Sequence, residues 1–300
     1  MAVSVNFLLK TSAVKHFGIK DLERFSGIKA HTIRIWEQRY AVFTPLRNTG
    51  NLRRYSVEDV HRLLCISTLI KNGHKISALA NSTTTELELR LKHSKDDEFR
   101  QSLAIGKLIY YMYCDLEKLE DLLDDCVQHW GIDQTIENII VPLLEKVDLL
   151  SYKDKTYEVH FTVVAIRKKI MFGIEKEKQP IHTQQPPALL FLQEGEHYDL
   201  FLLYMYYVLR KRGVRVLYLG TDISTKNLCQ LISDKQPKAL YTYVTDHKKL
   251  KLDSLAHYLK ESYPDTLIHA VTCQDVQGDK QVSNITFVPY HSFREWMTNR

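Results

Sequence analysis

The sequence has no stretch of about 18 consecutive apolar residues, the length that a membrane-spanning helix needs. Its first residues also lack the basic segment followed by an apolar run that is typical of a secretory signal peptide. We therefore expect a cytoplasmic protein with no membrane partner.

Cysteine is scarce, and its spacing has no pattern. The 5 cysteines are scattered without any C-x-x-C pair, which favours free thiols over disulfides or a zinc site. The sequence also lacks a glycine-rich phosphate loop, a Ser-His-Asp arrangement and a convincing pair of catalytic carboxylates. These absences predict no bound metal, no catalytic residues and no enzymatic activity.

Positive charge is concentrated at the start of the chain. Residues 1–80 hold 13 lysines and arginines against 5 acids, residues 81–150 hold 7 against 15, and the remainder holds 21 against 16. A basic first segment on an otherwise near-neutral chain indicates a polyanionic partner, and the usual one is nucleic acid. The acidic middle is repelled by DNA and should face away from it.

Two short helices joined by a glycine turn are expected between residues 19 and 40. Ile19, Leu22 and Phe25 recur at helical spacing before Gly27, and a second apolar face follows over residues 28–40. This order is typical of a helix-turn-helix, whose second helix can enter a major groove. The polar side of that helix carries groups suited to phosphates or base edges, namely Lys29, His31, Thr32, Arg34, Gln38 and Arg39.

A basic β-wing and a capped helix are predicted next. Residues 44–55 have the pattern of a strand, a turn containing Gly50 and a return strand rich in arginine. Ser56 begins a helix to about residue 71, because an acid stands at its third helical position. Thr83 with Glu86 would cap a later helix in the same way.

The turn, second helix and wing together resemble the MerR family of winged-helix transcription regulators, over about residues 17–85. The resemblance implies a bacterial homodimer that binds a double-stranded DNA operator. Arg34, Arg39, Tyr40, Arg53 and Tyr55 match family positions that clamp the DNA backbone. The full set of expected DNA contacts is Lys29, His31, Thr32, Arg34, Arg39, Tyr40, Arg47, Arg53, Arg54 and Tyr55.

A four-helix bundle is expected over residues 93–175. One apolar stripe begins at residue 103, Asp115 and Asp133 can cap the next two helices, and residues 157–174 form the fourth. Parts of this segment resemble the helical cap of cobalamin-binding light sensors related to the MerR family. His160 matches one of that group's three cap residues, and the other two are replaced.

Strands and helices alternate over residues 188–300, after a proline-bearing linker at 176–187. The alternation predicts a flavodoxin-like parallel sheet with ligands at the carboxyl ends of its strands. This segment resembles the cobalamin-binding Rossmann-like domain. When the two are aligned on Glu196, Tyr198 replaces the histidine ligand of cobalt and Phe201 replaces a required glycine, and the strand at 214–219 is expected to end at Gly220.

The cobalamin-related positions are therefore degenerate, and they are His160, Glu196, Tyr198, Phe201 and Gly220. Tyr241 and Tyr243 would also fill the slot for the nucleotide tail of the cofactor. We expect that the domain has kept its fold and lost cobalamin, so that no cofactor is bound.

The chain as a whole is predicted to be a multi-domain α and α/β protein. Its expected parts are an N-terminal extension (1–16), a winged helix-turn-helix (17–92), a helical bundle (93–175), a linker (176–187) and a degenerate Rossmann-like domain (188–300). The predicted function is sequence-specific, DNA-binding transcription regulation of MerR type. Two alternatives stay open: a repressor that senses light or a metabolite through cobalamin or another ligand, and a regulator controlled by a partner protein.

Overall fold

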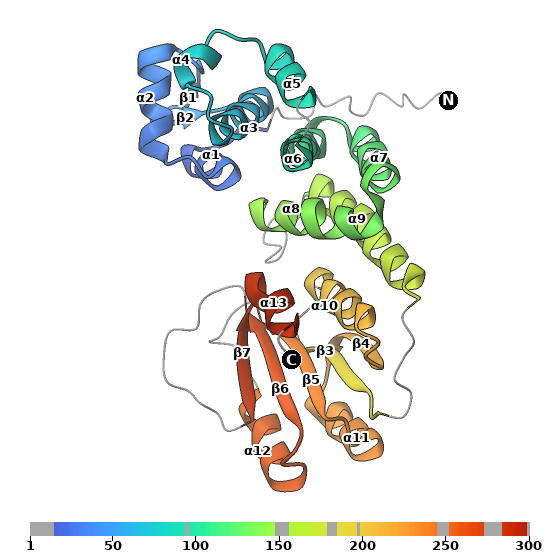
Figure 1. Cartoon of the computed structure of the whole chain (residues 1–300). Helices are drawn as coiled ribbons and strands as arrows, with labels where there is room; N and C mark the ends of the chain where they lie inside the picture. Colours follow the sequence, from blue (N-terminus) through green and yellow to red (C-terminus); the bar gives the residue numbers. More distant parts are fainter. Residues whose placement is uncertain are drawn as a thin grey trace, which may run out of the picture. The chain divides into compact units, whose positions relative to one another are not determined.

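The structure, a computed structural model, describes residues 15–93, 96–147, 156–178, 185–196, 199–244, 252–272 and 284–298. It divides into two compact units, one comprising Met1–Val147 and Tyr157–Thr162, the other Asp148–Thr156 and Val163–Arg300. Figure 1 shows the helices and the small wing of the first unit and the sheet of the second.

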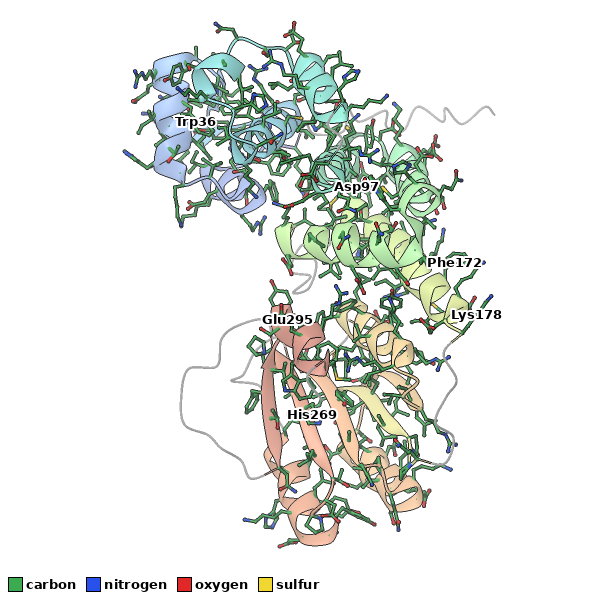
Figure 2. All side chains as sticks on the ribbon, in the orientation of Figure 1. Trp36, Asp97, Phe172, Lys178, His269 and Glu295 are labelled. Carbon is green, nitrogen blue, oxygen red and sulfur yellow. The ribbon has the colours of Figure 1, made fainter. Side chains whose placement is uncertain are left out.

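The first unit begins with the predicted helix-turn-helix. The first helix ends at Gly27, which has a φ of 73° and so takes a left-handed conformation that glycine adopts without strain. Figure 2 places Trp36 on the second helix, and Trp36 is buried together with Ile33. The two helices are α1 (Ile19–Ser26) and α2 (Ala30–Tyr40).

The predicted wing and the capped helices follow. At Ser56 the hydroxyl accepts from the Asp59 amide at 3.1 Å, and the Asp59 carboxylate accepts from the Ser56 amide at 2.9 Å. Thr83 and Glu86 exchange the same pair of bonds, so both expected caps are confirmed. The elements are the antiparallel pair β1 (Leu46–Arg47) and β2 (Arg53–Arg54), then α3 (Val57–Lys71), α4 (Ile76–Leu79) and α5 (Thr84–Lys92).

Further helices continue the first unit. The N-cap predicted at Asp115 is confirmed, because its side chain accepts from the Lys118 amide. The cap predicted at Asp133 is wrong: the helix breaks earlier, at Gly131, whose φ of 79° and ψ of 164° are open almost exclusively to glycine. The elements are α6 (Asp97–Cys114), which packs on α3, then α7 (Leu116–Thr135), a π-helix (Ile136–Ile140) and α8 (Val141–Lys146). The next helix, α9 (Tyr157–Lys176), begins in the first unit and belongs to the second unit from Val163 onward.

The second unit is built on a five-stranded parallel sheet in the order β4-β3-β5-β6-β7. The first strand of this unit, β3, lies second in the sheet between β4 and β5, and this is the flavodoxin-like order that the sequence predicted. The strands are β3 (Ala188–Gln193), β4 (Val216–Ile223), β5 (Ala239–Val244), β6 (Leu267–Thr272) and β7 (Ile285–Pro289). The helices are α10 (Leu200–Lys211), α11 (Thr225–Lys235), α12 (Leu252–Ser262) and α13 (Phe293–Thr298).

Alternate residues of each strand face opposite sides of the sheet. One face, which includes Leu240 and Ile268, packs against apolar residues of α11 and α12. The opposite face carries aromatic side chains that meet rings on α10 and α13. The sheet is therefore the middle of three layers.

The second strand of this unit does not end at Gly220, as the sequence had led us to expect. β4 continues to Ile223, and Gly220 lies inside it opposite Phe191, where the register with β3 shifts. Gly220 has a φ of 81°, and a bulge is a common use of glycine within a strand. The carboxyl end of this strand is thus displaced beyond the glycine.

None of the helices that the structure describes has both the length and the apolar character of a membrane-spanning segment. Residues 1–14 of the expected N-terminal extension lie outside the described part of the chain. The domain boundaries drawn from the sequence stay predictions.

Candidate nucleic-acid interface

A groove of about 430 Å³ lies where the start of α1, the helix α2 and the wing come together. None of the described residues that line it is acidic. The lining includes four cations, Lys20, Arg34, Arg53 and Arg54. A concave surface with one sign of charge concentrates counter-ions, so this groove attracts polyanions.

Lys20 is an exposed groove residue that the sequence analysis did not include among the DNA contacts. It lies in the first turn of α1, whereas the other groove cations lie on α2 and the wing. No local pattern marks it, because its proximity to the wing arises only when α1 folds beside residues 48–54.

The recognition helix α2 places the predicted contacts in two groups. Lys29 precedes its first turn with a side chain 83% exposed, and pairs with Glu23 at 3.4 Å. At the far end, the Arg39 guanidinium lies 5.4 Å from the centre of the Tyr40 ring. Of the expected contacts on this helix, the exposed ones are His31, Arg34 and Arg39, and the half-buried ones are Thr32 and Tyr40.

The turn of the wing is held by its own side chains. The Asn48 carboxamide oxygen accepts from the Gly50 amide at 3.1 Å and from the Leu52 amide at 2.8 Å. Arg47 donates to the Asn51 side chain at 2.7 Å. Both Arg47 and Arg54 are exposed, as expected for residues that contact DNA.

Arg53 and Tyr55 meet at one carboxylate. The Arg53 Nε donates to Glu37 Oε1 at 2.8 Å, and the Tyr55 hydroxyl donates to Glu37 Oε2 at 2.9 Å. Burial, then the bond to Glu37, raises the pKa of Tyr55, so its hydroxyl stays a donor. Tyr55 is 0% exposed, and its side chain secures the base of the wing from beneath the surface.

Arg62 on α3 stabilises the segments next to the interface through hydrogen bonds to their backbone. Its guanidinium donates to the backbone carbonyls of Val42, Ser82 and Ala80, at 3.2, 2.6 and 2.7 Å. One side chain therefore joins the end of the recognition helix segment to the loop between α4 and α5. The sequence analysis gave this arginine no role.

The predicted cofactor positions differ in their exposure to solvent. His160 is exposed on α9, Glu196 is half-buried and Tyr198 lies outside the described residues. Phe201 is buried on α10, with its ring centre 4.8 Å from that of Tyr243 on β5.

Aromatic rings pack between the sheet and the helices α10 and α13. Phe201 also meets Phe293 on α13 at 6.2 Å. His269, which Figure 2 places on β6, lies between Tyr241 at 4.9 Å and Trp296 at 4.8 Å. The described residues there form a packed aromatic cluster. A corrin-binding domain needs a glycine, which has no side chain, at the position of Phe201, so these residues do not fit the cofactor.

Comparisons with known proteins agree with the DNA-binding role that the basic groove indicates. Residues 17–84 match the family model described as MerR HTH family regulatory protein. The chain is 26% identical over 206 residues to the HTH-type transcriptional repressor CarA of Myxococcus xanthus, which covers 68% of each chain. It is 24% identical over 269 residues to the repressor CarH of the same organism, which covers 85% of this chain and 84% of the relative.

Among solved structures, the monomethylamine corrinoid protein of Methanosarcina barkeri is similar, with a TM-score of 0.49 and 12% identity over 65% of this chain and 95% of that chain. The family match, the two repressors and the helix-turn-helix with its wing support a DNA-binding transcription regulator of MerR type. Residues 17–84 are thus a MerR-type helix-turn-helix domain, in a chain that is similar to the CarA and CarH repressors.

Proposed function

We propose that the groove between α1, α2 and the wing grips the sugar-phosphate backbone of a double-stranded DNA operator. The observation that carries this proposal is the convergence of Lys20, Arg34, Arg53 and Arg54 on a groove with no acid among its described lining residues. Phosphate contacts of this kind fix the orientation and register of a protein on the duplex.

Base reading is assigned to the start of α2. Lys29, His31 and Thr32 lie before and within its first turn, and Lys29 and His31 are exposed. In helix-turn-helix proteins the first residues of the second helix reach base edges in the major groove. Lysine and histidine offer donors to guanine, and threonine can bond to several bases or contact a thymine methyl group.

The regulator should act as a homodimer. A two-fold dimer presents two recognition helices to half-sites one helical turn apart or a multiple of it, which matches the dyad symmetry of most operators. Both relatives are named transcriptional repressors, and we propose the same direction of control and no enzymatic activity for this chain.

The second unit is proposed to be a sensor domain that no longer binds cobalamin. The support is the aromatic cluster, because Phe201 and Tyr243 pack where a corrin and its tail need space. Incubation of the full chain with hydroxocobalamin, followed by desalting, should leave a colourless protein. Retention of cobalamin at a ratio near one per chain would contradict this proposal, and a colourless protein leaves a partner protein or another small molecule as the signal.

The DNA proposal is tested by fluorescence polarisation with the full chain and labelled duplexes from the region upstream of its own gene. Each neutralised phosphate lowers log K by about 0.9 per tenfold rise in salt, so the four groove cations predict a slope of about −3.6 per copy. Absent or salt-independent binding would remove the proposal.

A further inference from the structure

Glu37 is out of place on a surface that is otherwise suited to DNA. It is the one acidic residue of α2, whose segment is AHTIRIWEQRY. A carboxylate beside a phosphate-binding groove lowers the affinity for DNA by repulsion, unless it contributes something that outweighs this effect.

The carboxylate of Glu37 is fully engaged with the wing. Its side chain is 11% exposed, and each oxygen accepts one bond, from Arg53 Nε and from the Tyr55 hydroxyl. The bond to Glu37 raises the pKa of Arg53, so the guanidinium stays charged. Hydrogen bonds to a charged group are stronger than neutral ones, and a pair of them also fixes direction.

The pairing of its two strands contributes little to the stability of the wing. Its ladder consists of two residue pairs, Leu46 with Arg54 and Arg47 with Arg53, and such short ribbons are marginal in water. The base of the wing is secured at Tyr55, which exchanges backbone bonds with Phe17 at 2.9 and 3.0 Å. Glu37 then ties this base to the recognition helix.

The same contact fixes the Arg53 side chain. The guanidinium is planar, so a bond at Nε sets the plane in which the terminal nitrogens lie. Arg53 also lines the groove, and a phosphate there would meet donors that are already oriented. Preorganisation of this kind removes part of the ordering cost of binding.

We infer that Glu37 is a positioning residue that strengthens DNA binding by locking the wing to the recognition helix and aiming Arg53 at a backbone phosphate. The inference rests on the proposed function of the groove. It predicts an effect opposite in sign to the one that charge alone predicts, because removal of a negative charge from a DNA-binding face should otherwise tighten binding.

The test is a double-mutant cycle in the full chain. Glu37→Gln keeps the size of the side chain and removes the charge, and we expect the affinity for operator DNA to fall about tenfold, as for the loss of one charged hydrogen bond. In the Arg53→Ala background the same change should weaken binding by no more than about threefold, because only the bond from Tyr55 is then left to lose.

Glu23→Gln is the matched control. Glu23 also pairs with a cation beside the recognition helix, Lys29 at 3.4 Å, but it makes no described contact with the wing. Its removal should leave DNA affinity unchanged or raise it slightly. Wild-type-like or tighter binding by Glu37→Gln would overturn the inference while leaving the DNA proposal intact, whereas salt-independent binding by the wild type would overturn the DNA proposal itself.

Tyr55→Phe is the second variant, and it keeps the buried ring while removing the donor to Oε2. We expect a loss of affinity of about threefold, smaller than for Glu37→Gln because the Arg53 bond remains. Circular dichroism checks that each variant is folded. If Glu37→Gln does not fold, Tyr55→Phe carries the test, and unchanged affinity in that variant overturns the inference.

Discussion

At the scale of single residues, a half-buried carboxylate connects the helix-turn-helix to the helices that follow it. Glu88 on α5 accepts from Lys107 on α6 at 2.6 Å and lies 2.7 Å from the His61 Nε2 on α3. Burial alone would raise the pKa of Glu88, but the bonds from Lys107 and His61 outweigh it, and the pKa falls below its ordinary value of 4.5.

The depressed pKa predicts how stability depends on pH. The ionised Glu88 contributes stability that is present above its ordinary value of 4.5 and is lost as the pH falls through the lower folded value. Glu88→Gln should lower the free energy of unfolding by about 1–3 kcal/mol at neutral pH. Urea titrations at several pH values should show this difference in unfolding free energy shrinking as the pH falls below 4.5. A difference that does not depend on pH would contradict the assignment.

Arg34 provides the residue-scale prediction for DNA binding. It is exposed on α2 and lines the groove, so Arg34→Ala removes a proposed phosphate contact without removing core packing. We expect affinity to fall about tenfold and the salt slope to lose about one unit. Polarisation titrations measure both, with Lys118→Ala on α7 as a control that should bind like the wild type.

At the scale of elements, local signals predicted more than long-range ones. The caps at Ser56 and Thr83 were predictable because a capping box involves residues only three apart in sequence. The contact of Glu37 with Arg53 spans sixteen positions, so no local pattern encodes it. The wing was predictable as a ribbon, but its attachment to α2 was not.

Two glycines show the same limit. At Gly131 and Gly220 the sequence alone could not distinguish a helix break from a helix interior, or a bulge from a strand end. Both positions depend on where the neighbouring elements lie, and therefore on tertiary packing. The position of Lys20 in the groove was not predicted for a related reason, because the groove is formed by segments that are distant in sequence.

The prediction at the scale of elements concerns the stability of the helix break at Gly131. No atom lies within 4 Å of a Cβ added there, but the φ of 79° is strained for any L side chain. Gly131→Ala should therefore lower the free energy of unfolding by about 1–3 kcal/mol through backbone strain and not through a clash. Chemical denaturation tests this, and the exposed neighbour Gln128→Ala should stay close to the wild type.

At the scale of the whole molecule, the prediction concerns stoichiometry. One helix-turn-helix per chain reads one half-site, so two chains should bind each operator duplex. Analytical ultracentrifugation of the saturated complex should give two chains per duplex, and deletion of one half-site should lower the affinity sharply. A single chain per intact operator, with no loss on half-site deletion, would contradict the dimer proposal.

Lys146 on α8 donates from its Nζ to the backbone carbonyl of Phe25 at 2.8 Å, just before the glycine turn between α1 and α2. Burial, with the charge of Lys71 nearby, lowers the pKa of this amine, so the bond is made in a partly desolvated place. A displacement of α8 would therefore break this bond or shift the end of α1 with it. The bond thus connects α8 directly to the residues just before the turn at which the recognition helix begins.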